Sequence, residues 1–362
     1  MEKNKKNIAF LVGRVSIKGG ISRVTSIITD ELCKTGLYNI HVISYHPAEK
    51  GGYHWNSDIK FHNLLTARKS MKKGIIPATI NLTKVIKNNK IDILVATGHI
   101  VGPLCAIAKI FTKMKLLYWS HSSFFGEKHF SKSFNEKFTS LISNEVITLT
   151  KADEVNYLKY TKAKKVENIY NPIDKNLLVK ENLYDVNSKK IISVGRLTKS
   201  KQFNLLIDVA EIIFKENDEY ILDIYGTGEC ESTLAMQIDN ANLNNRIFLK
   251  GHVSDIYSKY KEYSMLVMTS EYEGFPMSLL EGMANKLPLV SFNVPTGPNE
   301  IITNNINGNL IDPFNVEDMA KSILDLINDS EKRIAYSSAN ENLIQEFSIE
   351  NVITKWVKML NN

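Results

Sequence analysis

The sequence is poor in cysteine and has no long uninterrupted apolar run. Its 362 residues include three scattered cysteines, Cys33, Cys105 and Cys230, and none lies in a Cys-x-x-Cys pair or at a metal-ligand spacing from histidine. This argues against a disulfide framework and a structural zinc site, and fits a reducing compartment. The most apolar stretch, residues 93–111, is interrupted by glycine, histidine, proline and lysine. We therefore predict a buried strand, a turn and a helix there, and no membrane span.

The beginning of the chain does not read as a secretion signal. Lysines precede the first apolar run, Ile8–Val12, but that run is too short for the apolar part of a signal peptide. No internal repeat or low-complexity segment is present. We expect a cytoplasmic protein, with peripheral binding to the inner face of the cell membrane as a further expectation.

Charge is unevenly distributed between the two halves. Residues 1–170 contain 27 of the 45 Lys and Arg residues and 12 of the 39 Asp and Glu residues, a net charge of +15, whereas residues 171–362 carry −9. Such asymmetry indicates that the first half faces an anionic partner: a membrane surface, a phosphorylated acceptor or nucleic acid. Lysines solvated on helix faces are the alternative, and no nucleic-acid-binding motif appears.

Two segments are candidates for that partner. The first is basic and could bind anionic lipid or form a solvated loop; it contains Arg68, Lys69, Lys72 and Lys73. The second could contact an acceptor or a membrane, or belong to the core; it contains Trp119, Phe124, Phe125, Lys128, Phe130 and Lys132.

Short apolar runs alternate with amphipathic stretches along the whole chain, which predicts βαβ units and parallel sheets. In the first half the predicted strands are Ile8–Val12, His41–Ser44, Ile91–Thr97, Leu116–Ser120 and, as the last, Val146–Leu149. In the second half they are Lys190–Val194, Tyr220–Tyr225, Ile247–Leu249, Met265–Thr269 and Leu289–Phe292. The predicted helices are Ser22–Lys34, Gln202–Phe214, Ser278–Asn285 and Val316–Asn328.

The pattern restarts after residue 171, so we predict an α/β protein of two Rossmann-like domains, residues 1–170 and 171–345. The segment 346–362 is an amphipathic helix that either packs back on the first domain or caps the second. Open α/β sheets bind ligands at the carboxyl ends of their strands.

The strongest chemical signal is a pair of glutamates, Glu273 and Glu281, eight residues apart. Pro276 lies between them, and proline is favoured in the first turn of a helix. We therefore predict Glu273 in a loop and Glu281 a little over a turn inside a helix, where it can accept hydrogen bonds from ribose hydroxyls. The start of such a helix attracts an anion such as a diphosphate. The amides concerned belong to Met277, Ser278 and Leu279.

This segment resembles the Glu-x7-Glu motif of the family-four retaining glycosyltransferases, and the resemblance covers nearly the whole chain. The second half also contains Gly195-Arg196 followed by Lys201. In that family an Arg and a Lys at this spacing hold the donor diphosphate and stabilise the leaving group. The physics agrees, because cleavage of the sugar–phosphate bond develops negative charge that fixed cations offset. The resemblance implies the GT-B fold, two Rossmann-like domains facing across a cleft, and no metal or other cofactor.

Other positions also match the family, more specifically within residues 190–310 than before residue 170. Gly226 lies in a Gly-x-Gly turn after a predicted strand, and Leu249 lies in the segment whose backbone reads the nucleobase. Gly19 and Gly20 resemble the loop that approaches the phosphates and the donor sugar, although an ordinary loop is the alternative. His121 corresponds to a histidine that contacts the donor sugar or the reaction centre; the alternative is a packed, hydrogen-bonded histidine.

Three further candidates are weaker. His99 also follows a predicted strand and lies beside glycines. Tyr272 and Phe275 could shape the sugar pocket or pack in the core. The segment 297–312, which contains Glu300 and Asp312, resembles a structural part of the family.

The resemblance implies a retaining hexosyl or N-acetylhexosaminyl transferase. It would act on a nucleotide sugar and on a glycan or lipid-linked acceptor in capsule or O-antigen biosynthesis. UDP is the first expectation for the nucleotide, with GDP and ADP open. Attack would come from the face that the diphosphate leaves, and that phosphate would take the acceptor proton. Glu273 would position the sugar, with a covalent carboxylate intermediate as the alternative.

Two other classes of protein share such a fold. An epimerase or phosphorylase fits poorly, because Arg196 and Lys201 accompany the glutamates and no cofactor-binding lysine stands out. A catalytically silent partner subunit or glycan-binding module is the remaining alternative. Such proteins often lose the Arg/Lys pair or the first glutamate, and this chain has all four residues.

Overall fold

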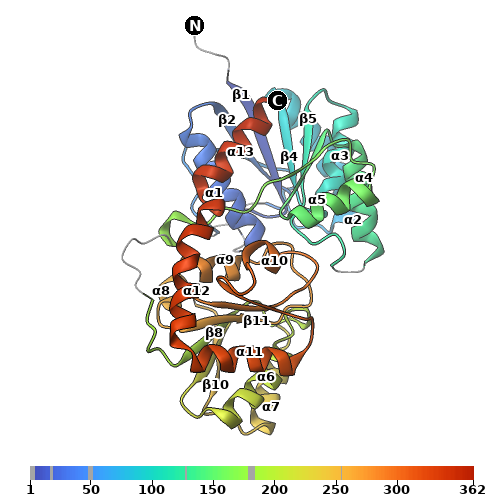
Figure 1. Cartoon of the computed structure of the whole chain (residues 1–362). Coiled ribbons are helices and arrows are strands. Elements are labelled where there is room, and N and C mark those ends of the chain that lie inside the picture. The colour runs from blue at the N-terminus through green and yellow to red at the C-terminus, as the bar shows by residue number, and fades with distance from the viewer. Residues whose placement is uncertain (1–4, 17–18, 48–51, 127–128, 178–183, 254) are drawn as a thin grey trace. The chain divides into compact units, whose positions relative to one another are not determined.

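The computed structural model describes residues 5–16, 19–47, 52–126, 129–177, 184–253 and 255–362. The chain divides into two compact units (Figure 1). Unit 1 comprises Met1–Pro172 together with Glu350–Asn362, and unit 2 comprises Ile173–Ile349. The boundary thus lies two residues later than predicted, and of the predicted C-terminal segment Glu350–Asn362 belongs to unit 1.

Unit 1 is built on a parallel sheet of seven described strands in the order β3-β2-β1-β4-β5-β6-β7. The strands are β1 (Lys6–Val12), β2 (Tyr38–Ser44), β3 (Lys60–Asn63), β4 (Ile93–Thr97), β5 (Lys115–Trp119), β6 (Glu145–Thr148) and β7 (Val166–Asn168). The order changes direction between β1 and β4. In open α/β sheets, ligands bind outside the carboxyl ends of the strands at such a switch point.

The helices of unit 1 cover both faces of this sheet. They are α1 (Gly20–Lys34), α2 (Met71–Asn88), α3 (Gly102–Ile110), α4 (Phe130–Ile142), α5 (Lys151–Tyr160) and α13 (Ile349–Asn361). Residues of α2 and α3, such as Leu82 and Leu104, share one apolar cluster with Leu11 of β1. On the opposite face, Trp356 of α13 packs against Phe10 and Trp119, with ring centroids 5.7 and 4.9 Å apart.

The C-terminal helix is also tied to the sheet of unit 1 by polar contacts. Lys6 Nζ donates to the carbonyl of Leu360 at 2.9 Å, and Tyr38 OH contacts Asn361 Oδ1 at 3.0 Å. The apolar stripe of α13 is therefore buried within unit 1, and its burial against the sheet stabilises the helix.

Unit 2 repeats the architecture with a parallel sheet of six described strands in the order β10-β9-β8-β11-β12-β13. The strands are β8 (Lys190–Val194), β9 (Ile221–Tyr225), β10 (Ile247–Gly251), β11 (Met265–Met268), β12 (Leu289–Phe292) and β13 (Gly308–Ile311). Its switch point lies between β8 and β11.

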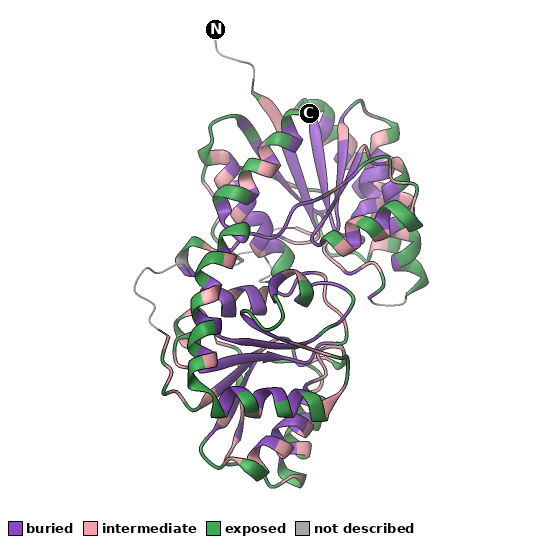
Figure 2. Ribbon diagram, in the orientation of Figure 1, coloured by how far each residue is buried: buried purple, intermediate pink, exposed green. Residues whose placement is uncertain are grey.

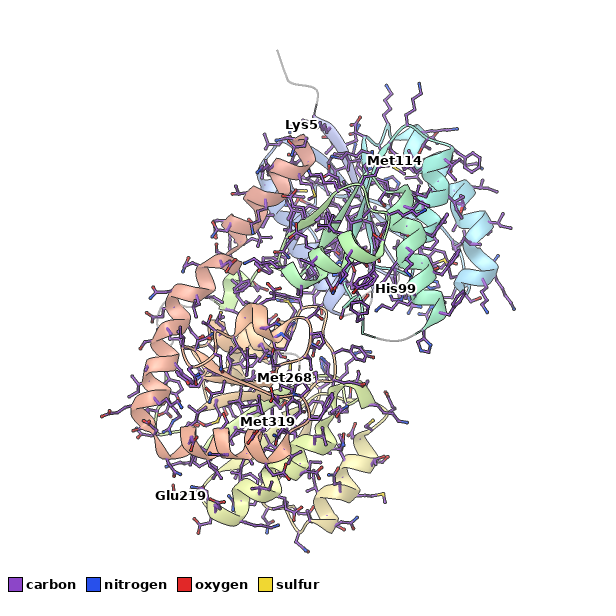
Figure 3. All side chains as sticks on the ribbon, turned by 45° about the vertical axis from the view of Figure 1, so that its right-hand side comes forward. Lys5, His99, Met114, Glu219, Met268 and Met319 are labelled. Carbon is purple, nitrogen blue, oxygen red and sulfur yellow. The ribbon has the colours of Figure 1, made fainter. Side chains whose placement is uncertain are left out.

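Helices and short turns surround this second sheet. The helices are α6 (Phe203–Glu216), α7 (Glu231–Asn240), α8 (Tyr257–Tyr260), α9 (Met277–Ala284), α10 (Pro298–Ile301), α11 (Val316–Asn328) and α12 (Ser330–Leu343), and the 3-10 turns are η1 (Lys175–Leu177), η2 (Lys199–Lys201) and η3 (Ile344–Phe347). Met319 of α11, labelled in Figure 3, is fully buried against the sheet. Figure 2 shows the same layering in both units, with buried strands and helices that expose their outer faces.

All predicted strands and helices are present in the structure, with shifts of a few residues at their ends. Three short strands were not predicted, namely β3, β7 and β13. The expectation that Val146–Leu149 is the last strand of the first half was wrong, because β7 pairs with β6 beyond it. The loop alternative for the basic segment was also wrong for Lys72 and Lys73, which lie in the first turn of α2, a helix that continues through Pro77.

Residues 93–111 form β4 and α3 with the turn between them, as predicted. Among the helices of the described ranges, none is long and apolar enough to cross a membrane.

Candidate functional site

The loops that follow β8 and β11 meet at the switch point of unit 2, because these two strands pair directly. The loop after β8 carries Gly195 and Arg196 and ends in the turn η2 with Lys201. The loop after β11 carries Glu273 and leads into α9. Sheet topology therefore brings the predicted cations and the first predicted glutamate, which are far apart in sequence, to one place.

The carboxylate of Glu273 is held by groups from both loops. Lys201 Nζ forms an ion pair with Glu273 Oε1, and Ser270 Oγ donates to the same oxygen at 2.7 Å. The side chains of Lys201 and Glu273 are 22% and 11% exposed. Thr296 Oγ1 fixes the backbone by donating to the carbonyl of Glu273 at 2.5 Å. The Glu273 carboxylate is thus a hydrogen-bond acceptor with a set orientation, and it lies beside the partly accessible Lys201 cation.

Backbone contacts hold the two loops in register. Thr269 Oγ1 contacts the carbonyls of Lys201 and Gln202 at 3.1 and 3.0 Å, and the amide of Glu271 donates to the carbonyl of Ser200 at 2.8 Å. Such pre-set geometry avoids reorganisation when charge develops in a reaction.

Gly226 allows the β8 loop to pass close to the loop after β9. Its φ is +140°, and a Cβ at this position would lie 1.8 Å from the carbonyl oxygen of Gly195. The amide of Gly195 donates to the carbonyl of Tyr225 at 3.0 Å, and that of Gly226 to Gly251 at 2.9 Å. Gly226 is thus required for backbone packing, and this packing sets the loop from which the exposed side chain of Arg196 projects.

Glu281 lies in α9, which begins at Met277 with Pro276 as its N-cap. Tyr260 OH donates to Glu281 Oε2 at 2.7 Å. Burial, and secondarily the nearby Glu281 carboxylate, raises the pKa of Tyr260 well above its usual range, so the phenol stays neutral. The Tyr260 hydroxyl therefore fixes the orientation of the Glu281 carboxylate.

The first turn of α9 differs in detail from the expectation. The amide of Leu279 donates to the carbonyl of Pro276 at 3.0 Å, and the side chain of Leu279 is fully buried. The amide of Leu279 is therefore bonded within the helix, and anion binding at Met277 and Ser278 stays a prediction.

Two other residues, Phe275 and Leu249, were predicted to bind the donor. Phe275 is 7% exposed and packs against Phe347 with ring centroids 5.8 Å apart, which favours the core-packing alternative. Leu249 is half-buried on the edge strand β10, which β9 and β8 separate from β11 in the sheet. The nucleobase contact predicted for the Leu249 backbone stays a prediction.

In unit 1, Gly19 caps α1 and Gly20 is its first residue. Both are exposed, and a Cβ on either would meet no described atom within 4 Å. Gly19 has an extended φ of −165°, which any residue adopts. The described structure gives no internal reason for glycine at these positions, so their approach to a ligand stays a prediction.

His121 follows β5 and packs against Trp119, with ring centroids 4.2 Å apart. Its Nε2 is buried without a hydrogen-bond partner among the described residues. Burial lowers the pKa of His121 to about 3, so its imidazole is neutral at neutral pH. His121 is therefore packed, as the alternative expected, but its Nε2 accepts or donates no hydrogen bond among the described residues. His99, labelled in Figure 3, lies in the turn after β4.

The loop that carries His121 rests on a buried polar cluster that the sequence did not reveal. Lys132 Nζ donates to the carbonyl of Ser123 at 2.5 Å, Ser122 Oγ donates to Glu136 Oε1 at 3.1 Å, and the amide of Phe124 donates to Asp153 Oδ1 at 3.1 Å. Burial raises the pKa of Glu136 to about 7. Lys132 is 3% exposed, so it fixes this loop and does not face an acceptor or a membrane.

Sequence reasoning missed Ser270, Thr296 and Tyr260. Ser270 lies three residues before Glu273, so a search for a donor near that carboxylate could have found it. Tyr260 and Thr296 carry no such signal, because only the packing of α8 and of the loop before α10 brings them near the site. Among the described residues there is no cluster of three or more His, Cys, Asp or Glu side chains that could hold a metal ion.

The chain is similar to known glycosyltransferases. Residues 174–343, nearly all of unit 2, match the family model "Glycosyl transferases group 1". A poly(ribitol-phosphate) alpha-N-acetylglucosaminyltransferase of Staphylococcus aureus is 30% identical over 312 residues, which span 83% of this chain and 61% of that protein. An uncharacterized glycosyltransferase of Haemophilus influenzae is 26% identical over 98% of this chain and 100% of its own length.

The solved structure of S. aureus TarM, with Fondaparinux, alpha-GlcNAc-glycerol and UDP, superposes with a TM-score of 0.83 at 18% identity. The match covers 99% of this chain and 100% of that one. It confirms the predicted two-unit α/β fold of GT-B glycosyltransferases. We therefore assign unit 2 of the chain to the group 1 glycosyl transferases, the family whose model it matches over residues 174–343.

Proposed function

We propose that the protein transfers a hexosyl or N-acetylhexosaminyl group from a UDP-linked donor, with retention of the anomeric configuration. The observation that carries this proposal is the Lys201–Glu273 pair, held by Ser270 at the switch point between β8 and β11. A cation beside a carboxylate, at the place where open α/β sheets bind ligands, suits a donor that carries both a diphosphate and a polyhydroxylated sugar.

Four charged side chains of unit 2 each have a defined task in this proposal. Arg196 and Lys201 bind the diphosphate and offset the negative charge that grows as the sugar–phosphate bond breaks. Glu273 accepts hydrogen bonds from the sugar hydroxyls and orients the ring. Glu281, oriented by Tyr260 at 2.7 Å, accepts hydrogen bonds from the ribose. Because two side-chain cations supply the charge, the proposed reaction needs no metal.

Retention follows, in this proposal, from attack on the face that the diphosphate leaves, with a phosphate oxygen accepting the acceptor proton. The alpha linkage in the name of the S. aureus relative supports it, since nucleotide-sugar donors of this kind are generally alpha-linked. Proton NMR of the product formed from a UDP-sugar tests the stereochemistry. An alpha-linked donor should give an alpha-linked product, and a beta anomeric signal would contradict the mechanism.

The proposed acceptor is a hydroxyl of a glycan or lipid-linked chain in bacterial surface-polysaccharide assembly. Support comes from the poly(ribitol-phosphate) acceptor in the relative's name and from the net charge of +15 on residues 1–170. An anionic or phosphate-bearing acceptor would be attracted to such a surface. Contact of Gly19, Gly20 and His121 with the donor sugar is part of the same proposal.

A thermal-shift panel of UDP, GDP and ADP, with and without EDTA, tests the donor class and the absence of a metal requirement. A nucleotide present at 100 times its dissociation constant stabilises the folded protein by about 2.7 kcal/mol, which is readily measured. We expect a selective shift with UDP that EDTA does not change. A shift that EDTA abolishes would contradict metal-free binding, and no shift with any nucleotide would favour a catalytically silent subunit.

A further inference from the structure

One side of unit 1 combines exposed apolar and exposed basic residues. Helix α3 packs between α2 and α4 on one face of the sheet, and Figure 1 shows the three helices grouped there. We call the solvent side of this layer the α2–α4 face. Its exposed residues are Lys72, Lys73, Ile76, Ile80, Lys84, Lys87, Ile110, Phe111, Lys113, Phe130, Phe134, Lys137 and Leu141.

The exposed residues of α2 lie at helical spacing along a single stripe. Lys73, Ile76, Ile80, Lys84 and Lys87 follow one another at intervals of three or four residues, which places them on one side of the helix. Ile76 is 71% exposed and Ile80 is 52% exposed. The stripe therefore has an aliphatic centre with lysines at both ends, while the opposite side of α2 is buried in the core of unit 1.

Helix α4 presents a second stripe of the same kind. Phe130, Phe134, Lys137 and Leu141 recur every three or four residues, and Phe130 is 88% exposed. The rings of Phe130 and Phe134 are stacked with centroids 6.5 Å apart. At the end of α3, between the two stripes, Ile110 and Phe111 are 65% and 60% exposed. Large apolar side chains this exposed, and gathered on one face, indicate a contact surface.

The face is almost free of negative charge. Residues 60–144 contain 14 Lys and Arg residues but three Asp and Glu residues, Asp92, Glu127 and Glu136. Of these, Glu136 is 1% exposed, and Asp92 lies before β4, outside the three helices. Within α2, α3 and α4, every charged side chain that the structure describes as exposed is a lysine.

We infer that the α2–α4 face docks on the surface of an anionic lipid bilayer. Lysines at the rim meet the lipid headgroups, while the isoleucine and phenylalanine side chains between them enter the headgroup–acyl boundary, the arrangement typical of interfacial helices. A nucleic acid would account for the lysines but would leave Ile76, Ile80 and Leu141 without a favourable contact. The inference is independent of the transfer reaction, because it concerns no residue of the nucleotide site.

Flotation with liposomes tests this inference. The protein is mixed with vesicles of phosphatidylcholine alone, or of phosphatidylcholine with phosphatidylglycerol, that contain no acceptor. We expect flotation with the anionic vesicles only, and weaker flotation as the salt concentration rises, because screening shortens the reach of the lysines. Equal flotation with both compositions, or binding to neither, would overturn the inference. So would binding to double-stranded DNA that displaces the vesicles.

Variants separate the basic and the apolar contributions. Lys84→Gln/Lys87→Gln should lower the partition coefficient about 25-fold, since each lysine near an anionic surface contributes about 5-fold. Ile76→Ser/Phe130→Ser should lower it about 10-fold or more through lost apolar contact. A result in which either double variant binds as well as the parent protein would overturn the inference.

Matched controls change exposed lysines and an exposed apolar residue on unit 2. Lys261→Gln/Lys321→Gln removes two exposed lysines, and Met236→Ser removes a side chain that is 65% exposed. Both controls should float like the parent protein, and a loss of the same size would show general charge or hydrophobicity instead of a docking face. The thermal shift of each variant with UDP reports separately on unit 2, so a failure of the nucleotide site is distinguished from a failure to bind membranes.

Discussion

Replacing Lys201 by methionine removes the cation that contacts Glu273 but keeps most of the side-chain volume. Among the described residues, Lys201 and Ser270 each donate a hydrogen bond to Glu273 Oε1. The proposal gives Lys201 a second task, which is to offset charge on the departing diphosphate. The substitution should therefore affect stability slightly and catalysis strongly.

The two effects differ in magnitude. The side chains of the ion pair are 22% and 11% exposed, so water screens the pair in part. Its loss should cost about 1–2 kcal/mol of unfolding free energy, between the values for exposed and buried pairs. For a unit of this size, that lowers the melting temperature by about 2–8 °C. Loss of transition-state stabilisation should lower turnover at least ~100-fold, or about 2.7 kcal/mol.

The assay compares initial rates with a UDP-sugar and thermal unfolding for the parent protein, Lys201→Met and Lys199→Met. Lys199 is an exposed lysine in the same turn, so its substitution changes the net charge equally and serves as the matched control. Turnover of Lys201→Met within about 5-fold of the parent would refute the assigned role, since a cation at the leaving group should contribute far more. An equal loss of turnover in Lys199→Met would show that the effect comes from the change in net charge and not from the position of Lys201.

Three further predictions concern other parts of the site. Gly226→Ala should destabilise unit 2 by about 2–4 kcal/mol in urea unfolding, because the added Cβ would lie 1.8 Å from the carbonyl oxygen of Gly195; a cost below about 1 kcal/mol would contradict this. Tyr260→Phe should raise the dissociation constant for UDP about 10-fold in calorimetry, since Glu281 loses the hydroxyl that orients it at 2.7 Å; an unchanged constant would refute that contact's role. Burial raises the pKa of Glu136 to about 7 from 4.5, so its contribution to stability is fully present below pH 4.5 and is lost as the pH rises to 7, by up to about 1.4 kcal/mol per pH unit. Glu136→Gln should flatten the pH dependence of unfolding over that window, and an unaltered slope would contradict the assignment.

The parts of the fold that the sequence predicted well have strong local patterns. Strands such as β8 and β11 are short apolar runs followed by glycine or polar loops, and α11 was predicted with its observed bounds, Val316–Asn328. The missed strands lack that pattern. β3 (Lys60–Asn63) has mostly exposed residues, β7 has three residues, and β13 begins at Gly308. These segments become strands because a neighbouring strand offers an open edge, which is a tertiary cause.

The site was predictable where one motif lies within a few residues of sequence. Glu273, Glu281 and the start of α9 follow from spacing and from Pro276. The partners of these glutamates do not, because Tyr260 and Thr296 reach them only through the packing of neighbouring elements. Lys132 shows the same limit: four residues before Glu136 on a helix, it resembles a solvated pair, yet both side chains are buried.

Hydrogen exchange with and without saturating UDP tests the central claim most directly, because it locates the nucleotide within the chain. We expect slower exchange in the loop and turn after β8, residues 195–201, and in the loop and helix after β11, residues 269–281. Exchange elsewhere in unit 2, such as in α12, should change little. Protection confined to other elements, or no protection at nucleotide concentrations that shift the melting temperature, would contradict a UDP site at this switch point.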